Sequence, residues 1–133
     1  TGHDGSMSTG HANSPEDMLS RLEVMSLMAS DMPLMAIRKQ IASSIDIIIQ
    51  LGRLRDHSRR VLEITEILGF DENKYMMNPL FKFQEEEADM VMEDAAEYGG
   101  RAIRPVRGSL IKTGNHLKNR GKLKASGIDL NGV

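Results

Sequence analysis

The chain has 133 residues, of which 40% are hydrophobic and 27% charged. This length suits one domain with its own core, and the composition is ordinary for a soluble protein and argues against disorder throughout. The net charge of −2 gives no whole-chain reason to expect nucleic acid as a partner, and the lack of cysteine excludes disulfides and thiolate metal sites. The longest apolar run, 45–51, is far shorter than a membrane span.

A short strand and a helix are the first predicted elements. Residues 6–11 favour a strand that ends in a polar turn. Asn13 or Ser14 can cap the helix that follows, and Pro15 suits its first position. The apolar side chains of this helix recur at helical spacing, which predicts a core-facing stripe. These side chains are Met18, Leu19, Leu22, Met25 and Ala29.

A second helix is predicted to begin at Pro33, after a break at 31–33. It carries an apolar face of Leu34, Ile37, Ile41 and Ile45. Residues 46–54 then predict a strand, because three β-branched isoleucines stand in a row. Such a run is typical of a strand buried on both faces, which favours a sheet covered by helices.

The strand over 46–54 is predicted to form a hairpin with a returning strand over 60–68, through a turn at 56–58. Arginines at a strand turn can clamp phosphates or a neighbouring subunit's carboxylates, or can simply be solvated at an exposed tip. The arginines around this tip are Arg53, Arg55, Arg59 and Arg60.

The second half of the chain is organised by charge. One or two short strands are predicted over 75–83, an acidic stretch of helical composition over about 84–97, and a closing helix over 115–125 that ends at Gly127. Residues 98–128 carry eight Lys or Arg and no acid, but no aromatic side chain lies beyond Tyr98 to stack on a base. We therefore expect no nucleic acid. The predicted division is a core over 1–68 and an extension over 69–133.

The opening segment concentrates groups that could carry chemistry. It contains His3, Asp4 and His11 among glycines and hydroxyls, and the following helix offers a positive end to an anion. It is interpreted as a phosphate-proximal loop, as a weak metal site of those three side chains, or as a plain polar loop. Because the chain begins at Thr1, inside this polar motif, a fragment is expected.

Three further features have plain interpretations. Gly114 and Gly121 do not form a phosphate-binding loop, because six residues separate them where that motif has four, and Leu123 replaces the magnesium-binding Ser or Thr. Arg21 lies one turn after Asp17, which predicts a local ion pair. The ten methionines are interpreted as core or packing surface rather than as a recognition groove.

Several runs of the sequence resemble the His-box region of secretion ATPases of the type II and type IV superfamily, and most nearly its tight-adherence (Tad) pilus branch. The resemblance is close over 1–68 and looser over 113–128. The runs that carry it include TGHDGS, STGHANSP and LSRLE, and they lie at 1–6, 8–15, 19–23, 37–43, 45–48 and 53–61.

The resemblance implies an α/β fold, namely the C-terminal portion of a RecA-like P-loop ATPase. It implies a cytoplasmic homohexamer at the inner membrane that moves platform proteins and uses ATP and Mg²⁺. The Walker A and Walker B segments would precede this chain, so the chain alone is expected to bind no cofactor and to be inactive. His3 and His11 would belong to the His box, with His11 as γ-phosphate sensor and Asn13 fixing the loop.

A further hypothesis places Arg21 and the hairpin arginines at a boundary between subunits. The alternative function is a non-enzymatic interaction domain that binds a partner through the arginine hairpin and the basic C-terminal segment.

Overall fold

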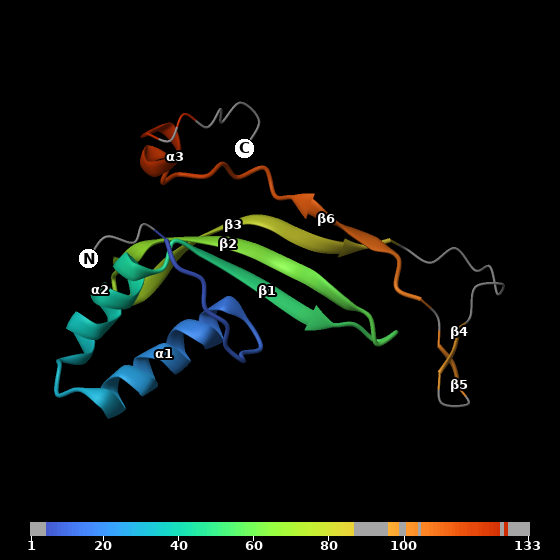
Figure 1. Cartoon of the computed structure of the whole chain (residues 1–133), viewed down its shortest axis with the longest axis horizontal. Helices are drawn as coiled ribbons and strands as arrows, with labels where there is room; N and C mark the ends of the chain where they lie inside the picture. Colours follow the sequence, from blue (N-terminus) through green and yellow to red (C-terminus); the bar gives the residue numbers. More distant parts are fainter. Residues whose placement is uncertain (1–4, 87–95, 99–100, 104, 126, 128–133) are drawn as a thin grey trace.

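Two helices pack against one face of a four-stranded antiparallel sheet with the order β1-β2-β3-β6 (Figure 1). The computed structural model describes residues 5–86, 96–98, 101–103, 105–125 and 127. The elements are α1 (Pro15–Ala29), α2 (Leu34–Ser44), β1 (Ile47–Arg53), β2 (Arg59–Asp71), β3 (Lys74–Glu85), β4 (Ala96–Tyr98), β5 (Arg101–Ile103), β6 (Gly108–Lys112) and α3 (Gly121–Ala125). Strands β4 and β5 pair with each other in a separate small sheet.

The limits of α1 follow from its capping residues. The Ser14 hydroxyl accepts a 3.1 Å hydrogen bond from the Asp17 amide, and the Asp17 carboxylate accepts one of 2.9 Å from the Asn13 amide. These reciprocal bonds fix the start of the helix. The backbone becomes extended at Ser30, and Pro33 precedes α2. The predicted starts of both helices and the break between them are confirmed.

The hydrophobic core lies where α1 and α2 meet β2. Its buried members are Leu19, Ile37, Ile41, Ala42 and Ile67. At the edge of this core the Arg38 guanidinium pairs with the Glu23 carboxylate at 3.1 Å and lies 5.5 Å from the centre of the Phe70 ring. The planar cation thus joins the two helices to the sheet.

The apolar stripe predicted for α1 is only partly in the core. Leu19 is fully buried and Leu22 packs beside it, whereas Met25 is 54% exposed. The C-terminal half of α1 therefore turns apolar side chains outward. The sequence predicts that the methionines are core or packing surface, and for Met25 and Met28, which are 54% and 84% exposed, the core interpretation is wrong.

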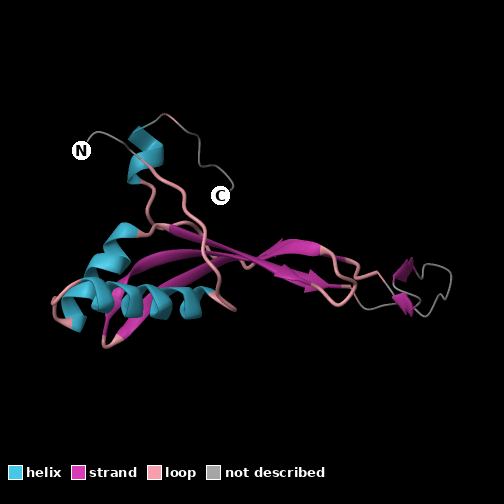
Figure 2. Ribbon diagram, turned by 60° about the horizontal axis from the view of Figure 1, so that its bottom comes forward, coloured by secondary structure: helices cyan, strands magenta, loops and turns pink. Residues whose placement is uncertain are grey.

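The hairpin of β1 and β2 is confirmed, with Arg53 opposite Arg59. The prediction that β1 is buried on both faces is wrong, because its residues alternate between exposed and half-buried along the strand. Ile48 packs against the core, while Ile49 on the opposite face is 54% exposed. Strand β1 is an edge strand, and α1 and α2 cover one face of the sheet. Figure 2 shows these helices on one side and the segment leading to α3 on the other.

Three other predicted elements need correction. Residues 6–11 form no strand, because no described strand pairs with them. Residues 75–83 belong to one long strand, β3. The closing helix is reduced to 121–125, because the amides of Lys118 and Asn119 bind the Glu66 carboxylate instead of helical carbonyls.

The acidic stretch is not helical where the structure describes it, since residues 84–85 end β3 and 96–97 begin β4. The rest of that prediction lies outside the described residues. The predicted division at residue 68 falls inside β2 and stays a prediction. Within the described residues no helix has the length and apolar character needed to span a membrane.

Candidate functional site

The His11 segment leads into α1 beside strand β1. The Gln50 side-chain amide donates a 3.2 Å hydrogen bond to the Ala12 carbonyl, which ties the segment to the middle of β1. His11 and Asn13 are both exposed at this point. A group that approached the molecule here could reach the His11 imidazole without any rearrangement of the core. His3 and Asp4 lie outside the described residues, and so does the metal site that includes them.

The N-terminus of α1 has fewer free hydrogen-bond donors for an anion than the sequence predicts. Pro15 has no amide hydrogen, and the Asp17 amide already donates to Ser14. The acidic side chains of Glu16 and Asp17 also occupy the positive end of the helix. In the described part of the chain there is no group of three His, Asp or Glu side chains that could hold a metal ion.

A carboxylate in the turn holds the arginine hairpin in shape. Asp56 accepts hydrogen bonds from the Ser58 amide at 2.9 Å and from its hydroxyl at 2.6 Å. It also accepts one of 2.7 Å from the amide of Val106, a residue that is 2% exposed. The Ser58 hydroxyl and the Val106 amide lower the pKa of Asp56 to about 2. Asp56 thus joins the β1–β2 turn to the segment that leads into β6.

The hairpin arginines do not all present a free charge. Arg55 forms a two-pronged ion pair with Glu85 at the end of β3. The hydrogen bonds from Arg55 lower the pKa of Glu85. A terminal guanidinium nitrogen of Arg53 lies 2.8 Å from the Nδ1 atom of His57. Arg59 and Arg60 take part in none of the ion pairs among the described residues and are exposed.

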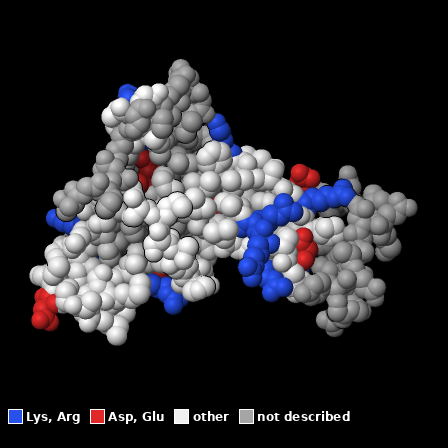
Figure 3. Space-filling model, viewed as in Figure 1, with Lys and Arg blue, Asp and Glu red and all other residues white. Residues whose placement is uncertain are grey.

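Figure 3 shows basic side chains gathered over the hairpin end of the sheet, with acidic ones beside them. The four predicted arginines therefore lie close together at the hairpin end. Two of them, Arg53 and Arg55, are engaged within the molecule. What remains for a partner is chiefly the charge of Arg59 and Arg60, held on a fixed turn.

A buried carboxylate on β2 anchors the C-terminal segment. Glu66 is 1% exposed and accepts hydrogen bonds from the amides of Lys118 at 2.9 Å and Asn119 at 2.7 Å. The Asn78 side chain donates a further bond of 2.8 Å. Burial opposes ionisation, but these donors together outweigh it, and the pKa of Glu66 is lowered. The C-terminal segment is thereby fixed to the sheet face opposite the helices.

The structure separates the predicted site residues into two groups. His11 and Asn13 lie where the segment meets α1, whereas the four arginines lie at the hairpin end. Arg21 is exposed on α1 and forms none of the ion pairs among the described residues. The Asp17 carboxylate predicted as its partner instead accepts from the Asn13 amide.

Sequence reasoning missed Asp56, Glu66 and Glu85. An Asp two residues before a Ser signals a side-chain-stabilised turn, so Asp56 could have been found. An acid within the apolar run of β2 signals a paired carboxylate, so Glu66 could have been suspected. Nothing local marks Glu85, because its partner Arg55 is 30 residues away.

The architecture defines an α/β protein in which two helices precede an antiparallel sheet. The family model described as Type II/IV secretion system protein matches residues 1–110 of this chain. The chain therefore belongs to the Type II/IV secretion system protein family, and its fold fits part of an ATPase domain, as predicted. No curated protein matches the chain.

Proposed function

We propose that this chain is the C-terminal part of an ATPase that powers pilus assembly or protein secretion, most nearly of the Tad branch. The observation that carries the proposal is the family match over 1–110, which begins at the His-containing segment and includes the whole arginine hairpin. In this proposal the motor is a cytoplasmic homohexamer that acts on platform proteins at the inner membrane.

The proposal gives the residues roles that their exposure and position support. His11 is exposed where the polar segment enters α1, and it acts as the sensor of the γ-phosphate, with His3 in the same His box and Asn13 fixing the loop. In this proposal the phosphate-binding loop, the magnesium ligand and the Walker B glutamate are supplied by residues outside this chain, and the capped start of α1 takes no part in holding the phosphates. Phosphoryl transfer needs all of these parts together.

The hairpin arginines serve a subunit boundary in the same proposal. Arg59 and Arg60 are exposed on a turn that Asp56 holds in shape, so their charges are presented at a fixed position. A pre-ordered arginine loses less freedom on binding a carboxylate or a phosphate than one on a mobile loop. The same feature supports the alternative function, a non-enzymatic domain that binds a partner through the hairpin and the basic C-terminal segment.

Two measurements test the proposed function. The coding sequence immediately upstream of Thr1 should contain G-x-x-x-x-G-K-[ST] after a strand, followed by a Walker B segment that ends in Glu. The purified 133-residue chain should show no magnesium-dependent ATP turnover. An upstream region without a phosphate loop would contradict the motor function and favour the alternative, a non-enzymatic interaction domain. Turnover by the chain alone would contradict the assignment of the cradle to other residues.

A further inference from the structure

The peptide group that joins Ala12 to Asn13 is held at both ends. Its carbonyl accepts the 3.2 Å hydrogen bond from the Gln50 side-chain amide, and its N–H donates the 2.9 Å bond to the Asp17 carboxylate. In a trans peptide the carbonyl and the N–H point in opposite directions, so the two side chains contact the peptide from opposite sides. This arrangement is called the peptide clamp.

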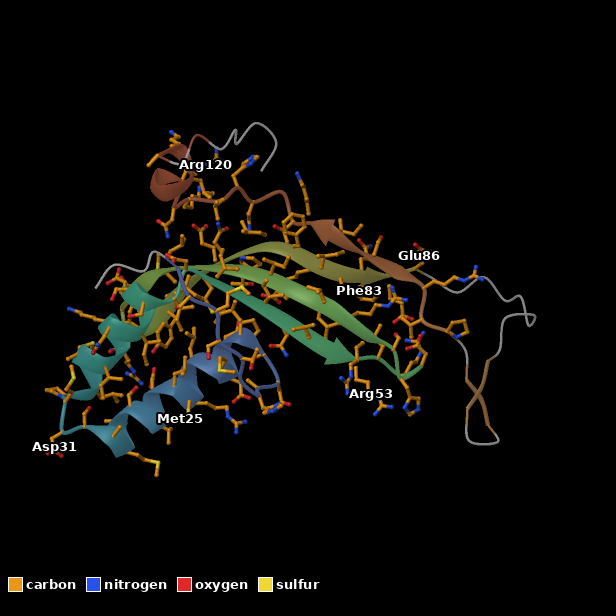
Figure 4. All side chains as sticks on the ribbon, in the orientation of Figure 1. Met25, Asp31, Arg53, Phe83, Glu86 and Arg120 are labelled. Atoms are coloured by element: carbon orange, nitrogen blue, oxygen red, sulfur yellow. The ribbon has the colours of Figure 1, made fainter. Side chains whose placement is uncertain are left out.

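The two side chains of the peptide clamp come from different layers of the fold. Asp17 lies in the first turn of α1, and Gln50 lies in the middle of β1, 38 residues beyond Ala12. Figure 4 labels Arg53 at the hairpin end of β1, and the segment that leads into α1 passes beside the strand before that end. The peptide is therefore fixed between a helix and the edge strand of the sheet.

Gln50 brings a polar group to a strand face that packs on apolar side chains. Ile48 lies two residues earlier and packs into the core, and alternate residues of a strand share a face. Gln50 is half-buried, and its amide nitrogen donates to the Leu51 carbonyl at 3.3 Å as well as to Ala12. Because both N–H groups of the amide are engaged, the side chain is held in the orientation that meets the Ala12 carbonyl.

The pairing of β1 with β2 is irregular directly after Gln50. Beyond the pair of Gln50 with Glu63 the register shifts by one residue, which leaves Leu62 of β2 opposite no residue of β1. The Leu62 side chain lies over Gly52, where an added Cβ would collide with a leucine methyl group. A β-bulge of this kind redirects the side chains beside it. It thereby helps to aim Gln50 at the segment before α1.

The peptide clamp restricts the residue that precedes it. His11 and Asn13 are exposed and Ala12 between them is half-buried, so the segment turns Ala12 toward the molecule and presents His11 to solvent. On the other side of His11, Gly10 packs against the end of the Met18 side chain, since an added Cβ would lie 2.5 Å from its terminal methyl group. Contacts at both neighbours of His11 therefore limit its backbone.

We infer that Gln50 is a positioning residue for His11. It acts through the clamped peptide one residue away, and consecutive Cα atoms are only about 3.8 Å apart. The catalytic part of the inference rests on the proposed function of His11 as γ-phosphate sensor, and it adds that strand β1 holds the sensor in place. Asn13 contributes its backbone amide to the same clamp. Placement matters because a displacement of about 1 Å can lower a rate about a hundredfold.

Relaxation of ¹⁵N nuclei in the 133-residue chain tests the clamp without any nucleotide. The amides of His11 and Ala12 should have order parameters of about 0.85, the value of a rigid backbone, and in Gln50→Leu they should fall below about 0.6. Gln50→Glu keeps the shape but replaces the donor with an acceptor, and it should loosen the same amides. Gln40→Leu, at an exposed glutamine of α2, is the matched control and should change neither amide. Denaturation midpoints check that each variant folds.

Turnover by the proposed motor, prepared together with its upstream phosphate loop, tests the catalytic part. Gln50→Leu should lower kcat roughly tenfold and leave the KM for ATP nearly unchanged, because a misplaced sensor is lost mainly from the transition state. In a His11→Ala background the same change should have no further effect, since no sensor is left to position. Gln40→Leu should leave kcat unchanged in both backgrounds.

Three results would overturn the inference. They are order parameters at His11 and Ala12 that stay the same in both Gln50 variants, a kcat that Gln50→Leu leaves unchanged, and a loss of kcat that is as large without His11 as with it. A His11→Ala motor with full kcat would instead contradict the proposed function of the sensor. The relaxation measurement would then still show whether Gln50 holds the segment, so the two proposals fail separately.

Discussion

At the helical end of the molecule, α1 and α2 pack on β2 through fully apolar side chains such as Leu19, Ile37 and Ile67. At the hairpin end, the β1–β2 turn, the end of β3 and the segment before β6 meet through polar contacts. Asp56 binds the amide of Val106, and Arg55 binds Glu85. The first end is stabilised mainly by removing apolar surface from water, whereas at the second end charges and hydrogen bonds are added to the burial of Val106.

This difference predicts different responses to mutation and to solution conditions. Burial of apolar surface depends little on pH, so the helical end should set the global stability. Ion pairs near the surface are screened by salt, and carboxylates lose their charge in acid. The hairpin end should therefore respond to pH and salt while the helical end stays folded. Arg59 and Arg60 lie at this responsive end.

The largest effect is expected in the core. Leu19→Ala should lower the free energy of unfolding by about 2–5 kcal/mol, because it removes a fully buried side chain and leaves a cavity. Chemical denaturation measures this loss. Met28→Ala on the exposed face of the same helix is the control and should cost less than about 0.5 kcal/mol. Equal losses in the two variants would show that α1 does not pack through Leu19.

The next largest effect concerns the anchor of the C-terminal segment. Glu66→Gln keeps the shape of the side chain but removes its charge and one acceptor, and should cost about 1–3 kcal/mol. The amides of Lys118 and Asn119 should also exchange with solvent faster, which hydrogen exchange measures residue by residue. Glu86→Gln, at an exposed side chain, serves as the control. Unchanged protection at both amides would contradict the anchoring role.

A pH effect is expected at the hairpin turn. The pKa of Asp56 is lowered from 3.8 to about 2 by the Ser58 hydroxyl and the Val106 amide. Because its pKa is lower in the folded state, the carboxylate stabilises the fold above pH 3.8, and this contribution is lost as the pH falls toward 2. Thermal unfolding of the unaltered chain and of Asp56→Asn should therefore converge in acid. Curves that stay parallel from pH 6 to 2 would exclude this contribution.

The smallest effect is expected from the exposed ion pair. Arg55→Gln should shift the unfolding midpoint only slightly at low salt, and the shift should vanish at high salt, because solvent and ions screen the pair with Glu85. Arg59→Gln changes the same type of side chain without breaking an ion pair described for the chain, and it is the matched control. A shift that persists at high salt would mean that Arg55 acts through packing instead of charge.

The sequence was sufficient for features that depend on neighbours along the chain. Apolar spacing and the residues Ser14, Pro15 and Pro33 predicted both helices, and the arginine-flanked turn predicted the hairpin. The number of faces that a strand buries depends on its neighbours in the sheet. A row of isoleucines therefore could not reveal that β1 lies at an edge.

Contacts between distant residues were out of reach for the same reason. The bond from Val106 to Asp56 spans 50 residues, and the bond from Asn119 to Glu66 spans 53. The second of these contacts replaces the helical turn predicted around 118, because an amide that donates to a carboxylate is lost to the helix. For the candidate site, the sequence pointed to His11, Asn13 and the arginines as candidates, but it did not reveal Asp56 and Glu85, which hold the arginine hairpin in place.

ATP turnover by the proposed motor, prepared together with the upstream phosphate loop that the proposal requires, tests the account most directly. His11→Ala should lower kcat severely and leave the KM for ATP nearly unchanged, because a γ-phosphate sensor acts mainly in the transition state. His116→Ala, at another exposed histidine on the C-terminal segment, should turn over ATP like the unaltered protein. Equal kcat values for the two variants and the unaltered protein would contradict the role assigned to His11.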